Sequence, residues 1–412
     1  MLIAAGVLLA ALLLATLAAR RTGDLLDQLV ADTELAYRPI ERTTHVAAPT
    51  QQTFVTLAAP RFPELKAAFD AYNVLPKETQ DACAAVRRRE RPVSDLPAEC
   101  RAQVDALRPA VRDVLASTHA EKLELPPELC TLHAESWARA AADWLPSQHV
   151  AKLVALDISM RLERRESAVD DCLDGLALAR DVSWSGGVIG AMLASSIDGI
   201  LFPSCAAALD AAGSGGDSII AIRDASKAFD GILHDEAVFG GLYFAGRTLN
   251  DDGLSRLKAP AAKLARMDST IVTDDLPTGT RYFPALAWRN FNCQVIERAH
   301  VMTLPEHERV AELERMRQRE QSSWSPFADK SPSDFANYYR RYLRGRDLLN
   351  GLAFIAAARS FHTEHHRWPT PAEANTEPGS WALEPDGDRL KLVLPETSTE
   401  RADGHAYTLA PR

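Results

Sequence analysis

The apolar and polar positions of the chain predict one membrane helix followed by a largely helical protein. Residues 2–19 are apolar apart from Gly6 and Thr16, and they have no polar face. As a helix rising 1.5 Å per residue, this stretch is about 27 Å long, close to the ~30 Å hydrocarbon core of a bilayer. We therefore predict that residues 1–21 form a transmembrane or signal-anchor helix, which makes the membrane the first expected partner.

The polar spacing after this helix predicts a linker and then a helical body. Residues 22–62 are predicted to form a stalk, because their apolar periodicity is weak and prolines interrupt it. Residues 63–332 are predicted to form antiparallel helical hairpins joined by short polar turns, with Ser147 and Ser167 as N-caps. The clearest helix has apolar residues at i, i+3 and i+4 spacing: Val104, Leu107, Val111, Val114 and Leu115.

A second long apolar run lies inside the predicted body. Val188–Leu201 is nearly all apolar, so it is either a second membrane span or a helix buried in the core. Asp198 lies within the run and Pro203 follows it, and a carboxylate in mid-bilayer is costly. We predict a central buried helix, whose small residues from Gly187 to Ser195 let a neighbouring helix approach closely.

Residues 333–412 are predicted to form a long helix followed by a small β-module. Ser333 is the predicted N-cap, and the helix is predicted to end at Trp368-Pro369, because a residue before proline avoids helical geometry. Asp386-Gly387-Asp388 separates two alternating segments, which is typical of a hairpin. The predicted fold class is therefore mainly α, with antiparallel helical hairpins and a small C-terminal antiparallel β-module.

Composition excludes some classes of protein. The chain is 46% hydrophobic and 25% charged, which is typical of a globular protein rather than a disordered one. The net charge of −10 disfavours a nucleic-acid partner, because such proteins present a basic surface. The longest basic run, residues 87–89, is interpreted as a solvated helix face.

Six cysteines and two arginines bear on the compartment. In an oxidising compartment six cysteines could form three disulfides in any of 15 pairings. Cys83 and Cys100 flank a proline-containing turn and are the predicted pair, whereas Cys172 and Cys205 are interpreted as small buried apolar residues. Arg20-Arg21 favours a cytoplasmic body, but an N-terminal apolar segment usually exports the rest of its chain. We predict a single-pass inner-membrane protein with a periplasmic body.

Two polar clusters contain the residue types of catalytic or metal-binding sites. His362, Glu364, His365 and His366 lack the spacing of a zincin, although His362 and His366 share a helix face and could form a weak divalent site. The simpler interpretation is a solvated helix end. The second cluster is Asp230, His234, Asp235 and Glu236, in which Asp230 could orient His234 as a base or ligand. No nucleophile or third ligand accompanies it at a recognisable spacing, so a role without chemistry is again the simpler interpretation.

Two further motifs were weighed. Ser255-Arg256-Leu257-Lys258 matches Ser-x-x-Lys, but the accompanying Lys-Thr-Gly motif is missing from the sequence, so we attribute the match to chance. A tyrosine stripe with neighbouring arginines is interpreted as core with a solvated basic face; the alternative is a surface for an anionic partner. Its residues are Tyr338, Tyr339, Tyr342, Arg340, Arg341, Arg344 and Arg346.

The C-terminal part carries one resemblance. In Leu348–Glu373 an Ala-rich helix ends in an aromatic-proline turn, Phe361-His362-Thr363-Glu364-His365-His366-Arg367-Trp368-Pro369, followed by Pro371-Ala372-Glu373. This pattern resembles pilin-like modules and uncharacterised, signal-anchored helical proteins of Gram-negative bacteria. The resemblance implies a periplasmic, membrane-tethered protein.

These observations give one expected function and one alternative. Because no motif meets the spacing of a known chemistry, no catalytic, cofactor-binding or metal-ligating residue is predicted, and no cofactor is expected. We expect a non-enzymatic membrane-anchored envelope protein that binds or scaffolds an envelope partner. The alternative is a periplasmic hydrolase, possibly metal-dependent, that uses the region of His234 or His362.

Overall fold

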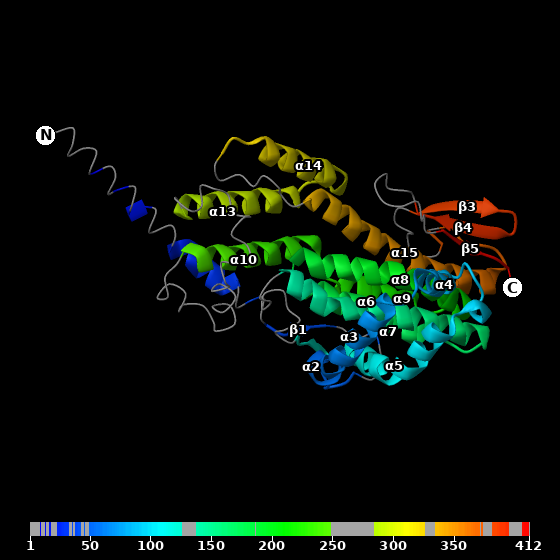
Figure 1. The fold of residues 1–412 in the computed structure, drawn as a ribbon. Coiled ribbons are helices and arrows are strands. Elements are labelled where there is room, and N and C mark those ends of the chain that lie inside the picture. Colours follow the sequence, from blue (N-terminus) through cyan, green and yellow to red (C-terminus); the bar gives the residue numbers. More distant parts are fainter. Residues whose placement is uncertain are drawn as a thin grey trace.

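The computed structural model confirms a mainly α fold with a small C-terminal antiparallel sheet (Figure 1). It describes residues 9, 13, 16–17, 23–32, 35, 38–42, 45, 49–125, 137–185, 187–248, 284–325, 334–370, 372–373, 381–394 and 406–411. Ser333, Cys130 and the Ser255–Lys258 motif lie outside the described residues, as do Arg20 and Arg21.

The described α-helices account for most of the described chain. Their bounds are α2 (Phe54–Leu57), α3 (Phe62–Asn73), α4 (Lys77–Arg87), α5 (Ala98–Ala116), α6 (Trp137–Glu163), α7 (Val169–Ser183), α8 (Gly187–Ala212), α9 (Gly216–Ala225), α10 (Phe229–Thr248), α13 (Pro284–Val301), α14 (Glu306–Ser322) and α15 (Phe335–His365). Three short 3-10 helices are η1 (Ala59–Arg61), η2 (Val93–Asp95) and η3 (Ser117–His119).

The strands form two small antiparallel sheets. The first pairs β1 (Ile40–Glu41) with β2 (Lys122–Leu123). The second has the order β3-β4-β5, with β3 (Ala382–Asp386), β4 (Arg389–Val393) and β5 (Ala406–Leu409). The predicted hairpin is confirmed, because Gly387 lies in the turn between β3 and β4 with a φ of 62°.

Helix α8 is the centre of the molecule and packs against α6, α7 and α15. Among the described residues it is the helix that is long and apolar enough to cross a membrane, yet 61% of its most apolar stretch is buried inside the protein. The predicted close approach is also present: a Cβ added to Gly345 of α15 would lie 2.9 Å from the Ser195 hydroxyl. The apolar run is thus explained by burial within the protein.

We call the helices that share one apolar core with α8 the main bundle. This core includes the predicted face of α5, with Val104 3% exposed and Val114 fully buried, and it extends to Leu392 of β4. The main bundle consists of α2 to α9, the C-terminal half of α15 and the sheet β3–β5. Residues of the predicted helical body and of the predicted C-terminal module therefore share a core.

A second, smaller core lies beside the main bundle. It joins α10, α13, α14 and the N-terminal half of α15, which we call the second layer (Figure 1), to Val188 and Ala191 at the start of α8. Tyr339 is 1% exposed and packs on Phe229 with ring centroids 4.8 Å apart, so the interpretation of the tyrosine stripe as core is right for this residue. Two of the arginines beside it contact α14: Arg340 pairs with Glu314 and Arg346 with Glu306.

Three predicted helix starts differ from the structure. Ser147 lies inside α6 rather than at its N-terminus, because the helix begins at Trp137 and continues through Pro146. The N-cap of α7 is Ala168, one residue after Ser167. At α15 the side chain of Asp334 accepts a hydrogen bond from the Asn337 amide at 3.1 Å, which is ordinary N-cap geometry.

Two disulfides link helices of the main bundle. Cys83 of α4 is bonded to Cys100 of α5, as predicted. Cys172 of α7 is bonded to Cys205 of α8. Both residues of this second pair are fully buried, so their interpretation was right about burial and wrong about bonding. Sequence spacing could not pair them, because only the packing of α7 on α8 brings them together.

Part of the predicted stalk lies on the main bundle. The guanidinium of Arg42 pairs with Asp181 of α7 and donates to the carbonyls of Ala120 at 2.8 Å and Ser117 at 2.9 Å. Its side chain is 4% exposed and that of Asp181 is fully buried. Burial lowers the pKa of Arg42, while the charge of Asp181 opposes that shift. Arg42 thus fixes the chain near residue 42 against α7.

Candidate functional site

A cleft of about 310 Å³ lies between α5, α6 and the start of α7, and it is the candidate binding site. Its floor is apolar and its rim is charged. The floor residues are Val104, Val111, Leu115, Leu153 and Val154, and the rim residues are Arg108, Arg112, Asp157, Arg161, Arg164, Glu166 and Asp171.

The helix periodicities explain why this cleft has two kinds of lining. Apolar residues of α5 and α6 that face the main core continue into the floor, where Leu115 is 5% and Leu153 4% exposed. The adjacent polar positions of the same helices form the rim. A cleft between helices with an apolar base and a few charged groups is a common form of binding site.

Ion pairs hold most of the rim in place. Arg108 donates to Asp157 at 3.0 Å and Arg164 to Glu166 at 2.8 Å, and Arg161 pairs with Asp171. Burial raises the pKa of Asp171 and the nearby charge of Arg161 opposes that shift. These arginines are therefore already neutralised in part by carboxylates of the cleft.

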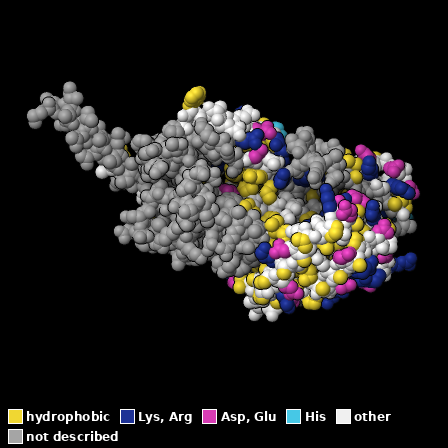
Figure 2. Space-filling view, viewed as in Figure 1, with side chains coloured by type: hydrophobic (Ala, Val, Ile, Leu, Met, Phe, Trp, Pro, Cys, Tyr) yellow, Lys and Arg dark blue, Asp and Glu magenta, His cyan; other side chains and the backbone are white. Residues whose placement is uncertain are grey.

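Arg112 differs from the other three arginines of the rim. It is exposed, and among the described residues it has no hydrogen-bond or ion-pair partner. Within the described part of the chain, the rim therefore offers one unpaired guanidinium beside carboxylates of several ion pairs. Figure 2 likewise shows basic, acidic and apolar side chains interleaved on the face of the body that it draws. A cleft of this kind suits a ligand with apolar groups and charges of both signs, such as a segment of a protein chain.

Two carboxylates of the α10 cluster, those of Asp235 and Glu236, have a structural role, because they bond the start of α8. Asp235 accepts hydrogen bonds from the Gly187 amide at 3.3 Å and from Lys227, and Glu236 accepts from the Val188 amide at 2.5 Å. Both carboxylates therefore satisfy amides at the start of α8, where the helix dipole also favours negative charge. They join the main bundle to the second layer.

The remaining members of this cluster do not form the predicted pair. The ion pairs of His234 run to Asp32 at 3.6 Å and Asp235 at 3.9 Å. Its contacts with these two acids raise the pKa of His234. Asp230 instead accepts a hydrogen bond from the amide of Gly231 at 2.7 Å. His234 thus contacts the helix at residues 23–32, whose Leu26 and Leu29 are buried.

Burial makes Glu236 an unusual acid. Removal from water raises its pKa to about 7, and the charge of Asp235 acts in the same direction, while the Val188 amide opposes the shift. Near neutral pH the side chain therefore populates both its protonated and its ionised form. Because the half-buried Glu236 lies at the junction of two cores, its ionisation affects their packing.

The histidines at the end of α15 do not converge on one point. His362 stacks on Trp368 with ring centroids 4.1 Å apart, and His365 contacts Phe361 at 4.2 Å. His366 leaves the helix with a φ of 57°. Burial, with the charge of Arg359, lowers the pKa of His362. This region forms the C-terminal end of a helix.

Sequence patterns did not indicate the cleft. Its rim combines residues of three helices, and no local spacing relates Arg108 to Asp157 or Arg161 to Asp171 before the packing of those helices is known. The chain matches no family model, no curated protein and no solved structure.

Proposed function

We propose that this chain is a non-enzymatic, membrane-tethered envelope protein that binds a segment of a partner envelope protein in the cleft between α5, α6 and α7. The observation that carries the proposal is the cleft itself, with its apolar floor and its rim of opposite charges. The carboxylates of the α10 cluster, Asp235 and Glu236, hold the start of α8 and do not face this cleft.

The disulfides support a periplasmic body. Two disulfides inside the main bundle fit an oxidising compartment, because reducing systems keep cysteines of cytosolic proteins as thiols. This favours export over the orientation that Arg20 and Arg21 would set. Protease treatment of spheroplasts tests it: the exported body is digested from outside, whereas a cytoplasmic body survives until the membrane is lysed.

The N-terminal segment supports the tether. Leu9, Leu13 and Leu17 recur every four residues, are helical and are 66%, 56% and 59% exposed. A helix face of exposed leucines is unfavourable in water and favourable in a bilayer. We expect the full chain to sediment with membranes and to resist extraction by high salt.

Site-specific photo-crosslinking in cells tests binding in the cleft. A photoreactive phenylalanine analogue replaces Arg112 in the cleft or, as the matched control, Arg315, an exposed arginine of α14 outside it. The proposal predicts a discrete crosslinked band from position 112 that is absent from position 315. The same bands from both positions, or none from position 112, would contradict it.

A further inference from the structure

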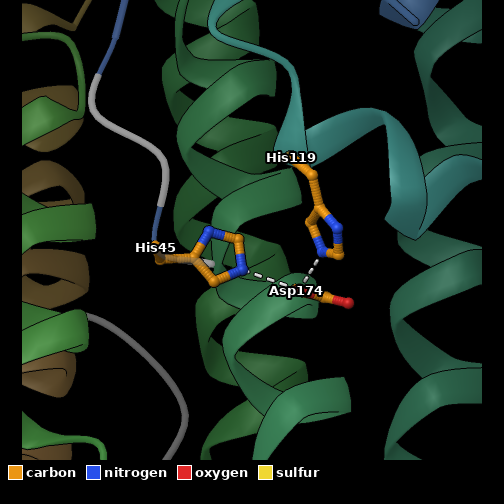
Figure 3. A group of neighbouring side chains, drawn as sticks. All are labelled: His45, His119 and Asp174. Carbon is orange, nitrogen blue, oxygen red and sulfur yellow. Dashed lines mark hydrogen bonds and ion pairs between the residues drawn. The ribbon is translucent and has the colours of Figure 1, made fainter. Parts of the chain in front are cut away.

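Two histidines and one aspartate that lie far apart in the sequence converge beside the chain segment held by Arg42. Nε2 of His45 lies 2.6 Å from Oδ1 of Asp174, and Nε2 of His119 lies 2.8 Å from the same oxygen (Figure 3). One ligand atom from each residue can be chosen so that all three lie within 4.8 Å of one another. The three side chains come from separate parts of the chain: a bend at residue 45, η3 and α7.

The two hydrogen bonds leave part of the bonding capacity of these three side chains unused. Both imidazoles are directed at one carboxylate oxygen, as Figure 3 shows. The side chain of His45 is 1% exposed, and its Nδ1 has no hydrogen-bond partner among the described residues. A buried polar group without a partner is costly, and both imidazoles also share a single acceptor oxygen, so hydrogen bonding leaves this group of side chains incompletely satisfied.

A bound cation would use all three groups as ligands. An ion about 2.0–2.2 Å from each donor requires donor atoms separated by roughly 3.3 Å in tetrahedral geometry. This separation is longer than the hydrogen bonds of 2.6 and 2.8 Å, and all three atoms lie within 4.8 Å of one another, so side-chain rotations that part Asp174 from the two imidazoles would open a place for the ion. Neutral imidazoles that now share one oxygen would each donate a lone pair instead.

The ligand set selects one class of ion. Two imidazole nitrogens with one carboxylate oxygen suit zinc and related first-row metals, whereas magnesium and calcium prefer oxygen ligands alone. The side chains of His119 and Asp174 are 24% and 15% exposed, which leaves a route for an ion and room for a water molecule as fourth ligand.

We propose that His45, His119 and Asp174 bind a divalent ion of the zinc class, which ties the chain around residue 45 to α7. Arg42, three residues earlier, holds the same segment against Asp181, about two helical turns further along α7. The ion would attach the chain around residue 45 to α7 at a second point, in addition to the ion pair of Arg42 with Asp181.

Zinc titration of the full chain in detergent, purified without a histidine tag and stripped with a chelator, tests the site. We expect one zinc per chain by calorimetry and visible Co²⁺ absorption bands typical of four-coordinate geometry. His119→Ala should weaken zinc binding by roughly 100-fold or more, since it removes a ligand. His362→Ala, a histidine at the end of α15, is the matched control and should bind as the wild type does.

Asp174→Asn provides a second variant that keeps the hydrogen-bonding shape but weakens the metal ligand. It should fold as the wild type by circular dichroism and lose zinc affinity. Zinc should also slow hydrogen exchange at the amides of Arg42 and Thr50, which bond to Glu121 and His119 at 3.0 and 3.2 Å. Absence of stoichiometric zinc, or unchanged binding in His119→Ala and Asp174→Asn, overturns the site. Binding without slower exchange overturns the attachment.

Discussion

The main bundle and the second layer are both helical, but different interactions join their helices. In the main bundle, disulfides and the fully buried Asp181 with its two arginines supplement apolar packing. In the second layer, ion pairs between half-exposed side chains connect α14 to its neighbours, as in Arg346 with Glu306 at 2.8 Å. Since exposed pairs contribute little and buried ones resist opening, we expect the second layer to unfold first.

The largest effect is expected at Asp181. Asp181→Ala leaves Arg42 and Arg180 buried without a carboxylate, which should lower the free energy of unfolding by about 3–5 kcal/mol. The matched control is Asp224→Ala, since Asp224 is 62% exposed in its pair with Arg223 and should cost less than about 1 kcal/mol. Urea unfolding measures both; equal losses would remove the contrast between buried and exposed pairs.

The disulfides are expected to rank next. Replacing Cys83 and Cys100 by alanine opens a loop of 17 residues and should cost about 3 kcal/mol; the 33-residue loop of Cys172 and Cys205 should cost slightly more. Cys293→Ala, at the exposed free cysteine of α13, is the control and should change stability by less than about 0.5 kcal/mol. A double alanine variant as stable as this control would show that its disulfide does not form.

Glu236 tests the junction between the two regions. Its pKa is about 7 in the folded protein and 4.5 in its ordinary state. The folded state therefore holds the proton more tightly, so this stabilisation is complete below pH 4.5 and is lost as the pH rises through about 7.

Between pH 5 and 8 the free energy of unfolding of the wild type should therefore fall by about 2 kcal/mol more than that of Glu236→Gln. Glutamine keeps the acceptor for the Val188 amide, and urea unfolding at each pH supplies the comparison. Parallel pH profiles would show that Glu236 titrates normally.

The smallest effect is expected within the second layer. Arg346→Ala breaks a pair whose side chains are 37% and 46% exposed, so the cost should not exceed about 1 kcal/mol. The difference from the wild type should shrink in 1 M salt, because screening weakens exposed pairs. A larger loss of unfolding free energy that salt does not change would mean that this pair stabilises the second layer as the buried pairs stabilise the main bundle.

Local patterns were sufficient for some elements and not for others. The apolar face of α5 follows from periodicity and the β-hairpin from its turn residues, while the burial of α8 follows from Asp198 within its apolar run. The Cys83–Cys100 pair was predictable because a short turn joins its two helices. The pairing of Cys172 with Cys205 depends on how α7 packs on α8, which periodicity does not specify.

The polar sites were missed for the same reason. His45 and Asp174 are 129 residues apart, and His119 and Asp174 are 55 apart, so no local motif contains the group. The histidines of the sequence cluster, His362 and His366, are close along the chain but diverge where the helix ends. Ser147 was predicted to be an N-cap, yet α6 begins ten residues earlier, at Trp137, and continues through Pro146 and Ser147.

The contact between residues 23–32 and α10 limits how far the body can stand from the bilayer. If residues 2–19 span the membrane, only residues 20–22 separate the span from a helix whose Leu26 and Leu29 are buried against the protein. Three extended residues reach about 10 Å. In the membrane-tethered arrangement that we propose, the body would then lie close to the lipid head groups, and a partner would have to come to that surface.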